Sequence, residues 1–419
     1  MSDEMSSAFS EEDLMYYKNA MRRKRIKAVI IAAVATLVIC CVCVVAAYVH
    51  SDDVPVAPGV TDSADVTVDS ETPVQSDSVE SVEGNINTVQ QLSGFPYTVQ
   101  DGEIITVRPF GKNIAVLSDG FLRLLNKKGS VVLSLPHSYA DPVIKTGAER
   151  GMIFDKLSGN YRVFNSSREV FAGNAGGEII TCDIGKNNRY AIAKFNEESV
   201  CVLSLMYADG SEEVFEWLCP TERIVSVSVS PNGEKVAAAV LSSQQGQLLS
   251  KVYVFDVHMT ETPEPFVCGA GEAVISVDFI SNNSACVVTD GSRTVISLES
   301  NAIGYSMTYD SSLLQYINSD DKGNTAVSLL TFGQIDSSTV FMYDKDNAEA
   351  YNQIVTTASA DAVACYNGNL SILYGDRVET YNKRGEKISE GFVPQTCNRL
   401  VASKSGVYAY SPNAVYFVS

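Results

Sequence analysis

The sequence is poor in the residues that most enzymes use for chemistry. Its 419 residues include 3 histidines (His50, His137 and His258) and 1 tryptophan, Trp217. Histidine serves general acid–base catalysis and metal binding more often than other side chains, so this scarcity argues against catalytic triads and metalloenzymes. The chain also lacks Cys-x-x-Cys, Gly-x-Ser-x-Gly, His-Glu-x-x-His and a phosphate-binding glycine loop. We therefore assign no catalytic, cofactor-binding or metal-ligating residue and expect no cofactor.

Positive charge is also scarce, and it is unevenly distributed. The chain has 31 Lys and Arg against 50 Asp and Glu, a net charge of −19. Nucleic-acid binding needs clustered basic residues that displace counterions, so we expect no nucleic-acid partner. No Lys or Arg lies between Lys27 and Arg108, and within this gap residues 51–94 are rich in acids, Ser, Thr and Pro. Such a segment buries too little apolar surface to fold, which predicts a disordered acidic linker over residues 50–94.

The longest apolar run predicts a membrane anchor. Residues 28–49 carry no charge and, as a helix, would span about 33 Å, enough to cross the roughly 30 Å hydrocarbon core of a bilayer. Basic residues 22–27 precede the run, and acids follow it. The positive-inside rule then places a tail of residues 1–27 in the cytoplasm and the rest of the chain outside. A cleaved signal peptide is the alternative, but the run exceeds the usual 7–15-residue length. We predict a single-pass plasma-membrane protein with an extracellular C-terminal domain.

Residues 95–419 have the pattern of an all-β domain. Val225, Val227 and Val229 alternate with serines, as expected for strands with a period of two. Asp-Gly and Asn-Gly pairs, which suit tight hairpins, punctuate such runs. Strands that open a recurring unit are expected near Ile104, Val143, Ile179, Ile224, Val274, Leu313, Ala362 and Leu400. Their mean spacing of about 42 residues is typical of a four-stranded propeller blade.

The last unit is one strand short, which predicts how the ring closes. Residues 400–419 have room for three strands, and Phe95–Val99, which precedes the first full unit, can supply the fourth. We therefore predict a β-propeller of eight four-stranded blades. Seven blades are the alternative, because residues 302–356 can be divided in more than one way.

Short segments resemble known propeller families. Residues 229–237, Val-Ser-Pro-Asn-Gly-Glu-Lys-Val-Ala, resemble the strand-turn-strand signature of WD-repeat and TolB-type propellers. The Asn-Lys-Lys-Gly turn at residues 126–129 and the Asn-Lys-Arg-Gly turn at residues 382–385 are similar to PQQ-type blades. The Trp-Asp signature of WD repeats is missing. The whole arrangement resembles an uncharacterised family of single-pass membrane proteins from bacteria of the Firmicute type, and the resemblance implies an architecture without an activity.

The number of cysteines bears on the cellular compartment of the C-terminal domain, because extracellular domains commonly pair their cysteines. Seven lie outside the predicted span, an odd number that cannot be fully paired in an extracellular domain: Cys182, Cys201, Cys219, Cys268, Cys286, Cys365 and Cys397. Several fall within apolar strands, where a free cysteine behaves as a small hydrophobic residue. We predict that they form no shared disulfide framework.

Two classes of function are compatible with these features. In the first, the propeller is a membrane-anchored binding or scaffolding module that recognises a protein or a polymer of the cell envelope through the loops that connect its blades. In the second, it is an enzyme that uses the central channel, as PQQ-type and glycan-cleaving propellers do. The shortage of histidine and of paired carboxylates favours the first. A sensor that signals through the tail is disfavoured by the shortness of residues 1–27.

Overall fold

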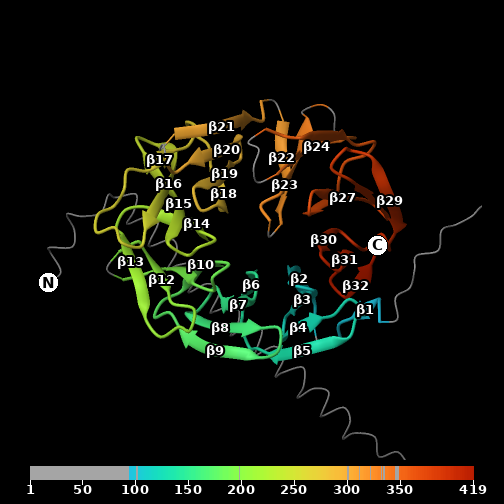
Figure 1. The fold of residues 1–419 in the computed structure, drawn as a ribbon, viewed down its shortest axis with the longest axis horizontal. Coiled ribbons are helices and arrows are strands. Elements are labelled where there is room, and N and C mark those ends of the chain that lie inside the picture. Colours follow the sequence, from blue (N-terminus) through green and yellow to red (C-terminus); the bar gives the residue numbers. More distant parts are fainter. Residues whose placement is uncertain are drawn as a thin grey trace, which may run out of the picture. The chain divides into compact units, whose positions relative to one another are not determined.

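The computed structural model describes residues 94–419, except 101, 198, 300–301, 311, 321, 332, 334–335 and 345–348. The described strands form eight sheets of four antiparallel strands, arranged as the blades of a closed ring (Figure 1). This confirms the predicted all-β propeller and decides between eight and seven blades. The predicted span, tail and linker lie outside the described residues. No helix among the described residues is long and apolar enough to cross a membrane.

The first four blades follow one another along the chain. Blade 1 contains β2 (Ile104–Phe110), β3 (Asn113–Ser118), β4 (Phe121–Leu125) and β5 (Val131–Pro136). Blade 2 contains β6 (Pro142–Thr146), β7 (Arg150–Asp155), β8 (Asn160–Asn165) and β9 (Glu169–Asn174). Blade 3 contains β10 (Ile179–Ile184), β11 (Tyr190–Lys194), β12 (Cys201–Met206) and β13 (Glu213–Cys219). Blade 4 contains β14 (Arg223–Val229), β15 (Lys235–Gln244), β16 (Gln247–Asp256) and β17 (Phe266–Val267).

The remaining blades complete the ring. Blade 5 contains β18 (Val274–Ser281), β19 (Ser284–Thr289), β20 (Ser292–Ser297) and β21 (Ala302–Thr308). Blade 6 contains β22 (Ser312–Ser319), β23 (Thr325–Thr331), β24 (Ser338–Tyr343) and β25 (Asn352–Val355). Blade 7 contains β26 (Ala362–Tyr366), β27 (Asn369–Tyr374), β28 (Arg377–Tyr381) and β29 (Lys387–Phe392). Blade 8 contains β30 (Arg399–Ser403), β31 (Gly406–Tyr410), β32 (Ala414–Phe417) and β1 (Tyr97–Thr98).

The first strand of each blade begins within one residue of its predicted position. Glycine turns explain this accuracy, because they end strands sharply. Gly233, for example, has φ +71°, a left-handed conformation that favours glycine, and a side chain there would collide with the amide of Asn187. In the stretch that the sequence left ambiguous, β21 closes blade 5 and β22 opens blade 6.

The ring closes through its two ends, as the sequence predicted. β1 pairs antiparallel with β32, with Tyr97 opposite Val415 and Thr98 opposite Ala414. Just before β1, the ring of Phe95 packs 5.4 Å from that of Tyr408. The closed ring therefore leaves no blade short of a strand.

Strand direction gives the propeller two distinct faces. In every blade the innermost strand runs away from the loop that connects it to the previous blade. The connecting loops and the turns between second and third strands therefore share one face, which we call the connecting face. The turns between first and second and between third and fourth strands lie on the other side. The chain enters β1 on that side, and we call it the N-terminal face.

Candidate functional site

Exposed acidic residues dominate the connecting face. In its described loops and turns one basic residue, Lys156, is outnumbered by acids contributed by almost every blade. The exposed acids are Glu103, Asp119, Asp141, Glu178, Glu197, Asp290, Asp310, Asp336, Asp361 and Asp376. Like charges spread over one face create a negative potential that attracts cationic groups.

Part of this acidity stabilises the loops themselves. Asp119 Oδ2 accepts a hydrogen bond from the backbone N–H of Glu103 (2.8 Å), and Asp290 Oδ1 accepts one from Ala273 N–H (2.8 Å). In blade 7, Asp361 Oδ2 accepts one from Gly375 N–H. Each bond ties a connecting loop to the neighbouring turn of its own blade. These three aspartates therefore have a structural role, as does Glu272, whose Oε2 accepts hydrogen bonds from the hydroxyls of Thr289 and Ser292.

Exposed apolar side chains lie on the same face. Leu157, Val200 and Leu248 occur in or beside the turns between second and third strands of blades 2, 3 and 4, with 63%, 41% and 37% of their surface exposed. The strands that flank the third of these turns are the longest, because β15 and β16 continue as a two-stranded hairpin up to the pair Gln244 and Gln247. Apolar tips within an acidic surface are typical of protein-binding faces, where a few apolar anchors carry most of the affinity.

The centre of the ring is lined by the innermost strands, and five of them contain a β-bulge at the same place. The extra residues are Ile105, Ile180, Val225, Ile275 and Gln315. A bulge re-aims the residues that follow it. Ile105 and Ile275 remain 43% and 45% exposed, so solvent reaches the axis of the ring at the connecting face.

Beyond the bulges, polar side chains link three of the innermost strands to the next one. Asp183 Oδ2 accepts a hydrogen bond from Val229 N–H (2.8 Å), and Ser228 Oγ accepts one from Phe279 N–H (3.1 Å). In the same way Asn318 Oδ1 accepts one from Cys365 N–H (2.9 Å). These bonds satisfy backbone groups that would otherwise face the axis without partners.

Asp278, on the innermost strand β18, has a raised pKa. Its side chain is exposed by area, yet the surrounding strands remove much of its hydration, and this burial raises the pKa of Asp278 above its ordinary value. The positive charge of Lys145 opposes the shift, and the negative charge of Asp183 reinforces it. Charges from blades 2, 3 and 5 therefore interact across the axis.

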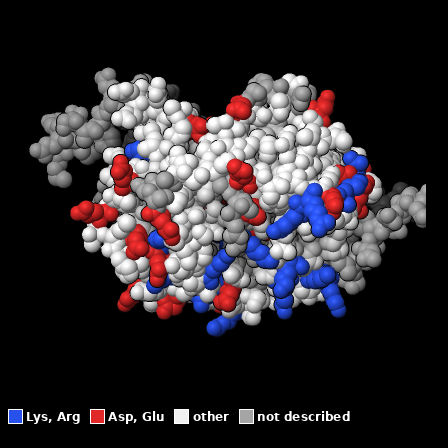
Figure 2. All heavy atoms as spheres, turned by 45° about the horizontal axis from the view of Figure 1, so that its top comes forward, with Lys and Arg blue, Asp and Glu red and all other residues white. Residues whose placement is uncertain are grey.

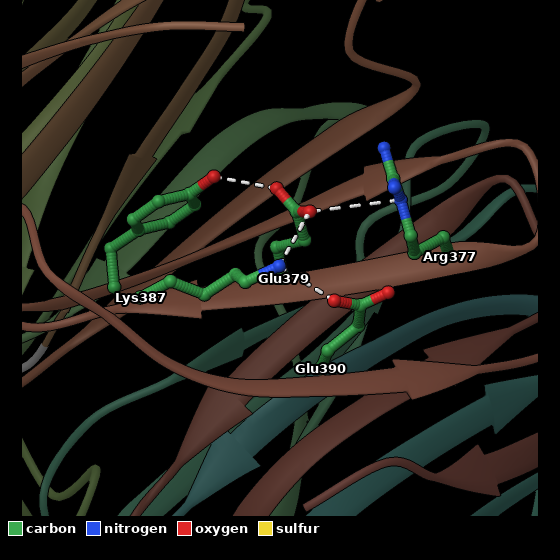
Figure 3. A network of polar contacts seen from close by, with 5 residues as sticks. Arg377, Glu379, Lys387 and Glu390 are labelled. Carbon is green, nitrogen blue, oxygen red and sulfur yellow. Dashed lines mark hydrogen bonds and ion pairs between the residues drawn. The ribbon is translucent and has the colours of Figure 1, made fainter. Parts of the chain in front are cut away.

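A network of charged side chains occupies the outer part of blade 7 (Figure 3). Glu379 Oε1 lies 3.7 Å from Arg377 Nε and 3.4 Å from Lys387 Nζ, and its Oε2 accepts a 2.5 Å hydrogen bond from the Tyr381 hydroxyl. Lys387 also pairs with Glu390 at 2.6 Å. Burial alone would raise the pKa of Glu379, but the bonds from Tyr381 and Lys387 and the Arg377 charge outweigh it and lower that pKa. Because the network joins β28 to β29, it stabilises the blade.

The cysteines and acids offer no metal centre within the described part of the chain. No group of three or more His, Cys, Asp and Glu residues there is arranged to hold a metal ion. All seven cysteines of the propeller are free and buried. Burial raises the pKa of the Cys219, Cys286 and Cys397 thiols to about 11, so these thiols are protonated and unreactive at neutral pH.

One family profile, described as a family of unknown function, matches residues 90–418, which is nearly the whole propeller. The chain belongs to the DUF5711 family. A search of curated proteins finds no match.

Solved structures place the DUF5711 propeller among WD-repeat-like folds. The chain is similar to Sqt1 of Saccharomyces cerevisiae, with 13% identity, a TM-score of 0.53, and coverage of 77% of this chain and 97% of that one. It is also similar to the β-propeller domain of Cps50 (Swd1) of Myceliophteria thermophila, with 10% identity, a TM-score of 0.45, and coverage of 77% and 98%. At such identities the first likeness supports the fold alone, and the second carries no argument.

The sequence reasoning identified no site residue, although one signal for the connecting face was available. Once strands are numbered within each blade, every loop falls on one face or the other. This assignment places the listed acids on the connecting face and most of the lysines of the turns on the N-terminal face. The exposure of Leu157, Val200 and Leu248 and the interaction of Asp278 with Lys145 and Asp183 depend on the folded structure. No local sequence pattern indicates them.

Proposed function

We propose that this DUF5711 protein is a binding module that recognises a cationic protein segment through its connecting face. The observation that carries the proposal is the concentration of exposed acids and apolar tips on that one face. A negative surface steers a basic partner toward it, and exposed apolar residues such as Leu157 and Val200 provide the contacts that hold it.

In the same proposal, residues 28–49 anchor the module in the plasma membrane and the propeller lies outside the cell. The charge-free run and its basic flank support this placement. The partner is then a protein of the cell envelope that carries a Lys- and Arg-rich segment.

Cross-linking in the cells that make the protein tests the proposal. A photo-cross-linking amino acid is placed in the full chain at Val200 or at Leu248, both on the connecting face, and at Lys404 on the N-terminal face as the matched control. We expect the two connecting-face positions to capture one common protein through a basic segment, and the control to miss it.

A second variant separates recognition from simple proximity. Glu178→Gln combined with Glu197→Gln removes two exposed charges that the structure does not use to hold loops. The captured protein should fall by about tenfold, because both lost charges lie beside the apolar anchors. Equal capture from both faces, or capture that ignores the glutamates, would overturn the proposal.

The alternative function, an enzyme at the axis of the ring, has one specific observation in its favour. Asp278 has a raised pKa to which the charge of Asp183 contributes, and glycoside hydrolysis uses a pair of carboxyl groups with different pKa values. Asp183 is engaged by the backbone of Val229, which explains its position without catalysis. Release of reducing sugars from envelope glycan by the purified propeller, lost in Asp278→Asn, would replace recognition with catalysis.

A further inference from the structure

The N-terminal face carries a compact basic patch. Its members come from turns of the three consecutive blades 7, 8 and 1, and all are exposed: Lys112, Lys127, Lys128, Lys383, Arg384 and Lys404. Among the residues that the structure describes, these six form no ion pair with a carboxylate. One acid shares their turns, Glu386, which accepts a hydrogen bond from Asn382. The patch therefore presents nearly its full positive charge to solvent.

The rest of the same face is different. The corresponding turns of blades 3, 4 and 5 carry Asp209, Glu212, Glu234, Glu261, Glu264 and Glu299 among their exposed residues. Figure 2 shows Lys and Arg gathered at the lower right of the visible surface and Asp and Glu on its left. Residues 95–419 are acidic overall, with 25 basic and 36 acidic residues. A patch of six basic residues whose turns hold one acid, Glu386, is therefore a marked local departure.

The patch surrounds the point where the chain enters the propeller. Gly94 packs so closely against the backbone of Lys128 and Gly129 that a side chain at position 94 would collide with it. β1 then runs from the N-terminal face toward the connecting face. Whatever precedes residue 94 therefore leaves the propeller beside Lys127 and Lys128. The basic patch therefore lies on the side of the propeller to which the predicted anchor is attached along the chain.

From this juxtaposition we propose that the basic patch docks the propeller on an anionic lipid surface. The inference rests on the anchoring part of the proposed function. If residues 50–94 are the flexible linker that their composition predicts, their root-mean-square reach is about 35–40 Å, which would let the patch approach the bilayer. Attraction acts within a Debye length of about 8–10 Å, which a flat basic face can satisfy with several residues at once.

The composition of the patch favours a lipid surface over a defined phosphate site. Five of its six members are lysines, whose compact ammonium groups interact with diffuse negative charge. Bidentate recognition of a single phosphate relies on arginine, and the patch offers Arg384 alone. Docking by this face also turns the connecting face away from the bilayer, where a partner can reach it.

Vesicle co-sedimentation tests the proposal with residues 84–419, a fragment that contains every strand of the closed ring. The vesicles are phosphatidylcholine alone or phosphatidylcholine with about one third phosphatidylglycerol. We expect binding to the anionic vesicles at low salt, loss of binding at high salt, and none to phosphatidylcholine. Lys127→Gln with Lys128→Gln should weaken partitioning about thirty-fold, since each basic residue near an anionic surface contributes about a five-fold factor.

The matched control removes the same charge elsewhere on that face. Arg168→Gln with Lys186→Gln changes exposed residues of blades 2 and 3 and should leave partitioning within about two-fold of the unchanged fragment. Thermal unfolding of all three proteins checks that they remain folded. Equal weakening by both double variants, or binding to soluble polyphosphate without binding to anionic vesicles, would overturn the proposal. Failure here with intact connecting-face cross-links would remove the lipid contact and leave the proposed recognition standing.

Discussion

Two interfaces between neighbouring blades solve the same packing problem in different ways. Between blades 3 and 4, fifteen buried residues form one apolar cluster in which Trp217 packs 4.8 Å from Phe255 and 5.0 Å from Tyr253. Between blades 5 and 6 the buried cluster contains four residues. Its neighbour is Arg293, which is fully buried, with its guanidinium carbon 3.8 Å from the ring centroid of Tyr343.

The difference shows that blade contacts in this ring need not be hydrophobic throughout. The guanidinium of Arg293 lies over an aromatic face and hydrogen-bonds the thiol of Cys286. A buried charge held in this way loses its hydration and regains part of the loss from the ring and the bond. Burial of apolar surface stabilises the interface between blades 3 and 4. Between blades 5 and 6, the cost of removing Arg293 from water roughly offsets its favourable contacts, and the contacts make the packing specific.

The largest expected effect is in the apolar interface. Trp217→Ala should lower the free energy of unfolding of residues 84–419 by about 3–5 kcal/mol, because a large aromatic side chain leaves a cavity in a dense core. Leu218, the next residue, is 55% exposed and provides the control, since Leu218→Ala should change stability by less than about 0.5 kcal/mol. Urea unfolding measures both, and comparable losses would contradict the packing described for this interface.

Blade 7 has a buried anion on its third strand, the strand that carries the buried cation Arg293 in blade 5. Glu379 is 8% exposed, and its pKa lies below the ordinary value of 4.5. A lowered folded pKa means that the ionised group contributes stability above about pH 4.5 and loses it as the pH falls below that value. Glu379→Gln should cost about 1.5–3 kcal/mol at pH 7 and less in acid. Unfolding curves from pH 7 to 3 should converge for the two proteins, and a constant gap would contradict the expectation.

The buried cation should be replaceable. Arg293→Met keeps much of the volume without the charge and should change stability by less than about 1 kcal/mol. Arg293→Ala removes both and should cost about 2–3 kcal/mol through the cavity. Thermal unfolding distinguishes the two outcomes. If Met is as damaging as Ala, the charge itself holds blades 5 and 6 together.

The smallest change in stability is expected for Asp278 at the axis of the ring. Its pKa is raised, whereas that of Glu379 is lowered, so substitution should have the opposite effect on stability. The folded pKa of Asp278 is raised above its ordinary value of 3.8, so the ionised carboxylate opposes folding above that folded pKa, and the penalty disappears as the pH falls through it. Asp278→Asn should therefore raise the stability at pH 7 by a few tenths of a kcal/mol, an effect limited by the solvent that reaches the group. Unchanged or lower stability would show that the charge of Lys145 dominates.

The blade plan was predictable because its signals are local. Alternating apolar residues mark strands, and glycines with positive φ mark where strands end, as at Gly129 and Gly385 in two equivalent turns. The closing role of β1 followed from counting strands. Each of these inferences needs no more than the neighbouring residues and the regular spacing of the blades.

The features of the site were not predictable in the same way. The bulges on the innermost strands add one residue without breaking the apolar pattern, so Ile105 and Ile275 read as ordinary strand residues. Arg293 lies between Ser292 and Thr294, a polar run that is typical of an exposed segment, and it packs against Tyr343 from another blade. Pairings between distant segments of this kind are set by the fold as a whole.

Closure through the two ends has a consequence for the synthesis of the chain. β1 is synthesised first among the strands, but its partner β32 is synthesised last. Tyr97 therefore cannot pair with Val415 until the chain is almost complete. At about 5–20 residues per second, the delay is roughly 15–60 seconds. During that time the growing row of blades has two open edges, and no intermediate length completes a ring. A chain that ended before β32 would therefore keep two unpaired sheet edges and would be prone to pairing with other chains. Closure of the whole domain thus depends on its last few residues.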